Sequence, residues 1–297
     1  MSRPRPPSLI VADIGAWYAA HARSLPWREP GVTPWGVLVS EFMLQQTPVP
    51  RVIGPWLAWL ERWPTAAALA PEEPGEAIRA WGRLGYPRRA LRLHATAVAL
   101  VRDHGGEVPA DLATLRTLPG VGEYTAAAIA SFGHQRRAVV LDTNVRRVLA
   151  RLAEGRAAAA PGLTVAERER AAAWLPDEPA AAAAWAAASM ELGAQVCTAA
   201  NPRCGQCPVA ADCRWLALGR PAAVGPARRP QAYEGTDRQC RGRLLARLRG
   251  SAGAVPEAEL LAAWPDGEQA TRCLRSLVAD GLVRPLGEEP GSAQYRL

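Results

Sequence analysis

The stretch that decides the fold is LPGVGEYTAA, residues 118–127. Its two glycines, Gly120 and Gly122, permit a tight turn, and a helix-forming run follows them directly. A turn of this kind presents backbone N–H groups at the start of a helix, where they can hold a phosphate group. An ordinary helix start has the same pattern. The sequence around this stretch is therefore needed to distinguish a phosphate-binding turn from an ordinary helix start.

The chain on both sides of this stretch is patterned for helices. Thr33 has the character of an N-cap, and Pro34 has that of a first helical residue. Alternating patterns typical of β-strands are nearly absent from residues 35–152. Helical patterns follow one another there, with short Pro/Gly breaks at 48–50, 64, 74–75 and 105–109. The sequence therefore predicts an all-α fold for the larger part of the chain.

The C-terminal part has a different character. Residues 219–236 contain a linker rich in Pro, Ala, Gly and Arg. Beyond it, three apolar clusters suit three short helices, and LVRPLGEEPGSAQYRL (282–297) suits two short strands around a turn. We therefore expect a core over residues 1–218, a linker over 219–236 and a small winged-helix-like tail over 237–297.

The composition favours an anionic partner. The net charge is +7 and the isoelectric point is about 9.5, which suggests nucleic acid first and a membrane surface second. All 35 basic residues are arginine, so no lysine can form a Schiff base with a substrate. No apolar run approaches the roughly 18 residues of a membrane-spanning helix. We expect a cytoplasmic protein that does not act on membranes, in which cysteines serve as metal ligands before they form disulfides.

Four cysteines form one compact group. The spacing is C-x6-C-x2-C-x5-C, and the residues are Cys197, Cys204, Cys207 and Cys213. Four thiolates can hold a tetrahedral zinc ion or a [4Fe–4S] cluster. Structural zinc sites usually have two short C-x2-C pairs, whereas this loop has one, so the pattern favours the cluster. Such close grouping argues against four unrelated buried thiols.

The quartet resembles the iron–sulfur loop of the endonuclease III and MutY group of helix-hairpin-helix DNA glycosylases. LPGVGEYTA is similar to the hairpin of that superfamily. VSEFMLQQT (39–47) and LDTNVRRVLAR (141–151) resemble its adenine glycosylase branch in particular. The similarity runs from about Leu25 to Cys213. It implies a two-lobed core, with a helical-barrel lobe at about 33–139 and an iron–sulfur lobe made of about 1–32 and 140–218.

Two carboxyl groups in different surroundings are the candidate catalytic pair. Glu41 lies in an apolar helical stretch, which predicts a raised pKa and a general acid. Asp142 has the position of a helix N-cap, which predicts a lowered pKa and an ionised group. A glycosidic bond can be broken by such a pair, because one group protonates the leaving base and the other stabilises the sugar cation. The alternatives are a solvent-facing Glu41 and an Asp142 that only caps its helix.

The resemblance assigns a role to each catalytic residue. It implies that Glu41 protonates N7 of adenine and later handles the attacking water. Asp142 would stabilise the oxocarbenium-like transition state, and Asn144 would support it by hydrogen bonding. Tyr124 stands where bifunctional relatives place a Schiff-base lysine, which implies base release without an efficient lyase step. Thr143 replaces a glycine that is common in adenine glycosylases.

The resemblance also assigns DNA contacts, since the target base has to be flipped out of the duplex. Gln45 and Gln46 would enter the base stack. Tyr86 belongs to the wedge loop, where the family often has a second tyrosine in place of Pro87. The resemblance puts Trp27 and Arg28 at the adenine pocket. The hairpin backbone can hold a phosphate, and the superfamily often binds a monovalent cation there; its residues are Leu118, Gly120, Val121 and Gly122. Independently of the resemblance, Arg88, Arg89 and Arg92 form a basic cluster that suits phosphate groups, with a merely solvated face as the alternative.

We therefore expect a monomeric, monofunctional adenine DNA glycosylase that acts on adenine opposite 8-oxoguanine or guanine in double-stranded DNA. A thymine or uracil mismatch glycosylase, a non-catalytic iron–sulfur DNA-binding protein and a lyase of the endonuclease III type are the alternatives. The 84 residues between Cys213 and the end of the 297-residue chain are too few for a Nudix-like domain, as in a short, actinobacterial-like form. Ala186 and Ala187 replace a polar pair of related enzymes, so the base preference stays open at this stage.

Overall fold

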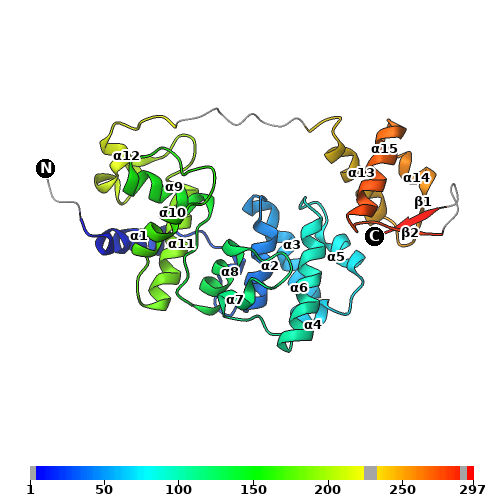
Figure 1. Cartoon of the computed structure of the whole chain (residues 1–297), viewed down its shortest axis with the longest axis horizontal. Helices are drawn as coiled ribbons and strands as arrows, with labels where there is room; N and C mark the ends of the chain where they lie inside the picture. The colour runs from blue at the N-terminus through cyan, green and yellow to red at the C-terminus, as the bar shows by residue number, and fades with distance from the viewer. Residues whose placement is uncertain (1–4, 224–232, 288–292) are drawn as a thin grey trace. The chain divides into compact units, whose positions relative to one another are not determined.

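The computed structural model describes residues 5–223, 233–287 and 293–297. The described chain is mainly helical and forms two compact units (Figure 1). The first consists of the chain up to Leu38, Pro109–Thr117 and the chain from Val121 to residue 223, and the second of Val39–Val108, Leu118–Gly120 and the chain from Tyr233 onward. The predicted all-α class is confirmed. No helix among the described residues is long and apolar enough to cross a membrane.

The first unit is built around helix α11 (Pro179–Gln195), which packs against α1 (Pro7–His21) and α9 (Thr143–Leu149). Its core contains Ile14, Val145 and Leu192. α1 and α11 each begin with a proline, whose fixed φ suits the first turn of a helix. The unit's other helical segments are η1 (Pro26–Arg28), α7 (Leu112–Leu115), α8 (Glu123–Ala128), η2 (Ile129–Gly133), η3 (Ala150–Glu154), α10 (Val165–Ala173), η4 (Cys204–Gln206), η5 (Ala210–Asp212) and α12 (Arg214–Ala217).

Helix α2 (Pro34–Leu44) begins as the sequence predicts. The backbone N–H of Gly36 donates to the Thr33 hydroxyl oxygen over 3.2 Å, which makes Thr33 the cap. The second unit continues with α3 (Val49–Arg62), α4 (Ala66–Leu69), α5 (Pro74–Trp81) and α6 (Arg88–His104). Its core contains a cluster of three buried tryptophan rings with edge-to-face contacts, Trp59, Trp63 and Trp81.

The tail consists of three helices and a small antiparallel sheet, as a winged-helix-like module requires. The helices are α13 (Asp237–Arg249), α14 (Glu257–Leu261) and α15 (Gly267–Ala279). The sequence predicts two strands, and the structure has three, in the order β1 (Val255–Pro256), β3 (Gln294–Arg296), β2 (Arg284–Leu286). The predicted turn between the last two strands falls on residues 288–292, and much of the predicted linker falls on 224–232; both lie outside the described residues.

Within the second unit, the tail is attached to helix α5. Nη1 of Arg79 donates to the carbonyl oxygens of Leu248, Arg249 and Ser251, at 3.3, 2.6 and 2.9 Å. In return, Nε of Arg249 donates to the carbonyl oxygen of Ile78 over 3.1 Å. Burial lowers the pKa of Arg249 to about 10, so the group stays charged at neutral pH. Arg79 thus satisfies the carbonyl groups at the end of α13.

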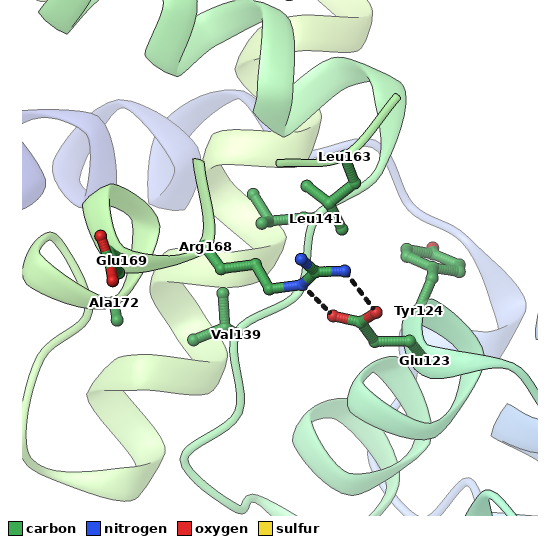
Figure 2. A pocket seen from close by; sticks show the side chains of 8 residues that line it. All are labelled: Glu123, Tyr124, Val139, Leu141, Leu163, Arg168, Glu169 and Ala172. Atoms are coloured by element: carbon green, nitrogen blue, oxygen red, sulfur yellow. Dashed lines mark hydrogen bonds and ion pairs between the residues drawn. The ribbon is translucent and has the colours of Figure 1, made fainter. Parts of the chain in front are cut away.

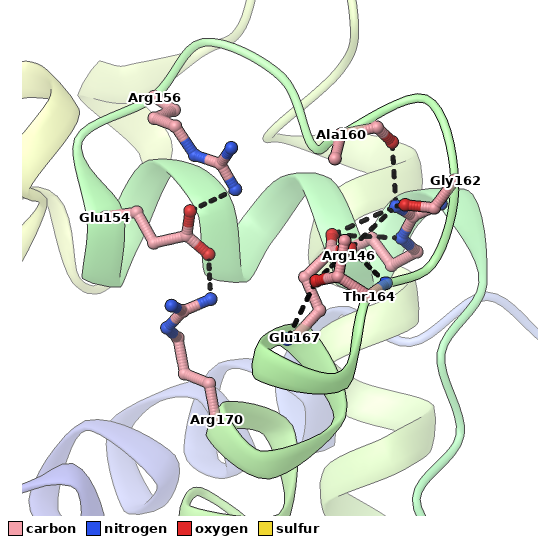
Figure 3. Close-up of polar contacts among 8 residues, drawn as sticks. All are labelled: Arg146, Glu154, Arg156, Ala160, Gly162, Thr164, Glu167 and Arg170. Atoms are coloured by element: carbon pink, nitrogen blue, oxygen red, sulfur yellow. Dashed lines mark hydrogen bonds and ion pairs between the residues drawn. The ribbon is translucent and has the colours of Figure 1, made fainter.

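The segment before α10 is held by a network of arginine and glutamate side chains (Figure 3). Arg146 of α9 contacts both carboxylate oxygens of Glu167 at 3.0 Å and donates to the carbonyl oxygens of Ala160 and Gly162. Glu167 also forms a capping box with Thr164 at the start of α10. This Ala- and Gly-rich segment is therefore pinned to α9, the helix that Asp142 begins.

Candidate active site and nucleic-acid interface

Asp142 is the N-cap of α9, as the sequence predicts. Its Oδ1 accepts hydrogen bonds from the backbone N–H groups of Asn144 (2.9 Å) and Val145 (2.7 Å). Oδ2 accepts from Nδ2 of Asn144 over 2.6 Å. The predicted direction of the pKa shift is wrong, however. Burial raises the pKa of Asp142 more than these hydrogen bonds lower it, because the buried carboxylate loses its hydration.

A chain of hydrogen bonds leads from this carboxylate to the cysteine loop. Nη2 of Arg147 donates to Oδ1 of Asn144 and to the carbonyl oxygen of Gly193, both over 2.7 Å. Nε of Arg147 donates to the carbonyl oxygen of Cys197 over 2.6 Å. Arg147 therefore fixes the amide that faces Asp142 and the first cysteine of the quartet at the same time. The sequence shows the motif that contains Arg147, but it does not predict the contact between Arg147 and the cysteine loop.

The four cysteines of the quartet are half-buried, and three of them pack against the core of the first unit. Burial and the neighbouring thiols raise the pKa of Cys207 to about 11, which shows that the sulfur atoms influence one another. Nη1 of Arg151 lies 3.4 Å from Sγ of Cys197. Within the described residues, no three His, Cys, Asp or Glu side chains are placed to hold a metal ion together. Four sulfur donors beside a buried arginine nevertheless suit a metal group with anionic thiolate ligands.

The Trp27–Arg28 turn is anchored by a residue that the sequence does not single out. Glu191 of α11 has no exposed surface and accepts from Nη1 of Arg28 at 3.0 Å. It also accepts from Nε of Arg23 at 2.6 Å and from Nε2 of Gln195 at 2.6 Å. Burial raises the pKa of Glu191, but the hydrogen bond from Arg23 and the charge of Arg28 outweigh it and bring the pKa to about 2. The one feature of the sequence that could have pointed to Glu191 is a carboxylate within an alanine-rich helix.

Tyr124 lies on α8 and lines a cavity of about 320 Å³ (Figure 2). Leu141, the residue before Asp142, lines the same cavity, so the structure brings Tyr124 near the start of α9. Arg168 and Glu123 form an ion pair at 2.6 Å beside it, with both side chains largely exposed. The rest of the lining consists of three apolar residues and one carboxylate: Val139, Leu163, Ala172 and Glu169. The phenol thus lies beside both apolar and charged side chains.

Glu41 lies inside α2 and is only 6% exposed. Its neighbours Leu38, Val39 and Met43 have no exposed surface, and Phe42 is 1% exposed. The alternative of a solvent-facing glutamate is therefore wrong. The role as a general acid stays a prediction.

The two glutamines follow α2 instead of lying on it. α2 ends at Leu44, and Gln45 and Gln46 form the turn before α3. Gln46 is exposed and has a φ of 55°, in the left-handed region. The sequence predicts that they lie on the helix of Glu41, one turn further along, because they continue its pattern; the prolines at 48 and 50 require an end before that point.

The expected basic cluster divides into residues with different positions. Arg88 and Arg92 are exposed on α6, and Arg88 forms an ion pair with Asp280 of the tail. Arg89 is only 5% exposed and points into the second unit, where it donates to backbone carbonyl groups. Arg89 is therefore wrongly assigned to the phosphate-binding cluster. Arg88 and Arg92 are one helical turn apart and share a face of α6, whereas Arg89 is offset from them, and the sequence does not show which face is buried.

The hairpin requires glycine at one position. Gly120 has a φ of 79°, and a Cβ there would lie 2.9 Å from Cβ of Arg92 and 3.0 Å from the ring of Phe42. Gly122 has a φ of −88°, which other residues also adopt, and it directly precedes α8. Both glycines are exposed, whereas Leu118 and Val121 are buried. The hairpin therefore presents backbone, not side chains, at its surface.

Known proteins resemble this chain in sequence and in fold. The model of the HhH-GPD superfamily of base excision DNA repair proteins matches residues 39–172. The adenine DNA glycosylase of Mycobacterium tuberculosis is 53% identical over 94% of this chain and 91% of its own length. The human adenine DNA glycosylase is 41% identical over 67% of this chain and 38% of its own length. A thermostable thymine-DNA glycosylase (TM-score 0.64, 23% identity) covers 71% of this chain and 97% of its own, and an endonuclease III–DNA complex (0.61, 21%) covers 71% and 95%; both share the fold.

Proposed function

The chain belongs to the adenine DNA glycosylases of the HhH-GPD superfamily, and from this premise we propose that it removes adenine paired with 8-oxoguanine or guanine in double-stranded DNA. The observation that carries the proposal is the 53% identity to a mycobacterial adenine DNA glycosylase over 91% of that protein. The protein is a glycosylase, a hydrolase of N-glycosidic bonds. The net charge of +7 suits a polyanionic partner.

The reaction begins with adenine flipped out of the duplex. Glu41 donates a proton to N7 of the base, and the bond between C1′ and N9 breaks with its electron pair moving to the base. Water then adds to C1′, and the proton that it loses returns to the Glu41 carboxylate. The support for this role is the position of Glu41, which is only 6% exposed inside α2.

Asp142 stabilises the positive charge that develops on the sugar. Its carboxylate has to be ionised for this role, although burial raises its pKa. The side-chain amide of Asn144 donates a hydrogen bond to Oδ2 of Asp142 over 2.6 Å, which fixes the orientation of this carboxylate. The reaction ends with base release, because the phenol of Tyr124 forms no imine and the chain contains no lysine.

The DNA contacts involve both turns and helix ends of the chain. Gln45, Gln46 and Tyr86 fill the space that the extruded base leaves, and Arg88 binds a phosphate group. The hairpin, residues 118–122, binds a further phosphate through backbone N–H groups, together with a monovalent cation. Trp27 and Arg28 line the adenine pocket, and Glu191 holds Arg28 there.

The four cysteines Cys197, Cys204, Cys207 and Cys213 would hold a [4Fe–4S] cluster. When it is bound, the cluster supplies a rigid link between the ends of the loop 197–213. Arg147 and Arg151 connect this loop to α9, so they maintain the position of Asp142 relative to the loop.

A base-release assay on four duplexes tests the proposal. Purified protein is offered duplexes with A:8-oxoguanine, A:G, T:G or U:G, and free base is measured with and without alkali treatment of the strand. We expect adenine release from the first two and strand breaks only after alkali. Glu41→Gln should abolish release and keep DNA binding. Release from T:G or U:G alone would contradict the proposal, and the presence of zinc without iron would exclude the cluster.

A further inference from the structure

Two turns of the second unit contain a residue with left-handed backbone. Gln46, in the turn after α2, has a φ of 55°, and Tyr86, in the turn before α6, has a φ of 47°. Residues other than glycine rarely adopt this region, because the side chain crowds the backbone. Both side chains are exposed, Tyr86 by 52%. Both are also residues that enter the DNA under the proposed function. A conformation of this kind persists only where the surroundings impose it.

A single buried guanidinium holds both turns. Nη1 of Arg89 donates to the carbonyl oxygen of Gln45, and Nη2 donates to the carbonyl oxygen of Gly85 at 3.0 Å. These two carbonyl groups directly precede the two left-handed residues. Nη2 also donates to Oγ1 of Thr47, the residue after Gln46, at 2.9 Å. Arg89 therefore fixes the peptide groups that precede Gln46 and Tyr86, and the side chain of Thr47 directly after Gln46.

The surroundings of Arg89 keep it away from DNA. The residue is only 5% exposed, and its guanidinium carbon lies 5.2 Å from the ring centre of Trp81 and 5.5 Å from that of Tyr86. Burial lowers the pKa of Arg89 to about 10, so the group is charged at neutral pH. Nη1 also reaches the carbonyl oxygens of Phe42 and Met43, at 2.9 and 3.0 Å, which end helix α2. The guanidinium of Arg89 thus interacts with backbone carbonyl groups inside the unit and is not available to bind a DNA phosphate.

Thr47 provides a second link between the same turns. Its side chain is buried, and Oγ1 lies 3.3 Å from the carbonyl oxygen of Leu84 while it accepts from Arg89. The turn after α2 and the turn before α6 are therefore joined at two points. They are 40 positions apart in sequence, from Gln46 to Tyr86, yet they are held as one rigid surface.

We propose that Arg89 is a positioning residue for DNA opening: it holds the turns 45–47 and 84–86 in one register, so that Gln46 and Tyr86 enter the duplex together. This inference rests on the proposed function. It predicts that Arg89 contributes to extruding the base and not to the chemistry that follows. Loss of Arg89 should then matter most where the target base is hardest to unstack.

The test compares two substrates under single-turnover conditions. One duplex carries an A:8-oxoguanine pair between matched neighbours, and the other carries the same pair between two mismatches, where unstacking is easier. We expect Arg89→Met to slow adenine release from the matched duplex by about tenfold or more, and from the mismatched duplex by about threefold or less. In the matched duplex, 2-aminopurine next to the target should show a weaker rise in fluorescence. Arg102→Gln, an exposed arginine near the end of the same helix, is the control and should behave as wild type.

The outcomes separate the inference from the proposed function. If wild-type protein releases no adenine from either duplex, the proposed function fails. If wild type is active and Arg89→Met loses the same factor on both duplexes, Arg89 has only a structural role and the inference is overturned. If Arg89→Met does not fold, Thr47→Val decides, since it removes one hydroxyl from the link. This variant should lose about threefold on the matched duplex alone, and equal loss on both or no loss would contradict the inference.

Discussion

At Gly193 the absence of a side chain lets two helices approach each other closely beside the carboxylate of Asp142. A Cβ at this position of α11 would lie 2.7 Å from Cβ of Asn144 and 2.9 Å from its carbonyl oxygen. Both contacts are shorter than packed atoms tolerate, so Asn144 would have to move. Because Asn144 also binds Asp142 and Arg147, a shift there changes the orientation of the carboxylate that we propose stabilises the sugar cation.

We therefore predict that Gly193→Ala slows adenine release by about 100-fold and lowers stability by about 1–3 kcal/mol. Single-turnover assays and urea unfolding measure the two effects. Gly15→Ala is the matched control, because a Cβ on Gly15 of α1 would meet no atom within 4 Å. Wild-type activity in Gly193→Ala would show that α11 can withdraw without moving Asn144.

Asp142 shows a conflict between stability and function at one residue. Its pKa is raised in the folded protein, so the folded state binds the proton more tightly than the unfolded state. The stability that this group contributes is present at low pH and is lost as the pH rises through the folded-state pKa. At neutral pH the ionised Asp142 is therefore a buried charge that the proposed mechanism requires and that stability does not.

We predict that Asp142→Asn abolishes adenine release but leaves the protein at least as stable as wild type at pH 7, since asparagine is also a good N-cap. As the pH falls below the raised pKa, the advantage of the variant should disappear. Asp111→Asn should show the opposite trend, because the pKa of Asp111, an exposed N-cap, is lowered by its hydrogen bonds with Thr114. Urea unfolding between acid and neutral pH measures both. A variant clearly less stable than wild type at pH 7 would contradict the prediction.

At the scale of elements, local rules predict the beginning of helices better than their packing. Thr33 and Asp142 are recognisable caps, because the residues that they bond lie two or three positions away. Glu191 and Arg89 are not recognisable, because their partners are brought together only by the fold. Arg23 is 168 positions from Glu191, and the carbonyl oxygens that Arg89 binds on α2 are 46 and 47 positions away. The same distinction explains why the sequence predicts the cap formed by Asp142 but not its raised pKa. The cap depends on residues two and three positions away, whereas the burial depends on the fold.

Helix α11 joins η1 to the rest of the first unit through Glu191, and this gives a prediction. The pKa of Glu191 is lowered to about 2, so its contribution is present above the unfolded pKa of about 4.3 and is lost as the pH falls toward 2. Glu191→Gln should lower the free energy of unfolding by about 3 kcal/mol at pH 7, because Arg23 and Arg28 lose a buried counter-charge.

Urea unfolding at several pH values tests this, and the difference between wild type and Glu191→Gln should shrink below about pH 4. Glu123→Gln is the matched control: its partner Arg168 is equally close, but both side chains are exposed, so the expected change is at most about 1 kcal/mol. An equally small effect of both substitutions would mean that the Glu191 pair does not anchor η1.

At the scale of the whole molecule, the helical patterns of the sequence predict the fold class and the helices of the tail. They do not predict how the tail is attached to the rest of the second unit. The sequence presents residues 237–297 as a separate module after a linker. The structure places this module in one compact unit with α3–α6. The contacts are arginine to carbonyl, and any arginine of a chain with 35 basic residues could make them. Composition cannot show which one does.

The attachment of the tail to α5 can be tested by hydrogen exchange. Arg79 binds three carbonyl oxygens at and beyond the end of α13, so Arg79→Gln should leave these groups without their donor and loosen the tail. We predict faster amide exchange in α13 and α15, by about tenfold, with little change in α9 and α11 of the other unit. Arg62→Gln is the control, since Arg62 pairs with Glu72 and Glu76 at the surface of the same unit and lies over the ring of Trp63. Unchanged exchange in α13 would show that apolar packing alone holds the tail, and faster exchange throughout the protein would show that Arg79 stabilises the whole fold instead of this attachment.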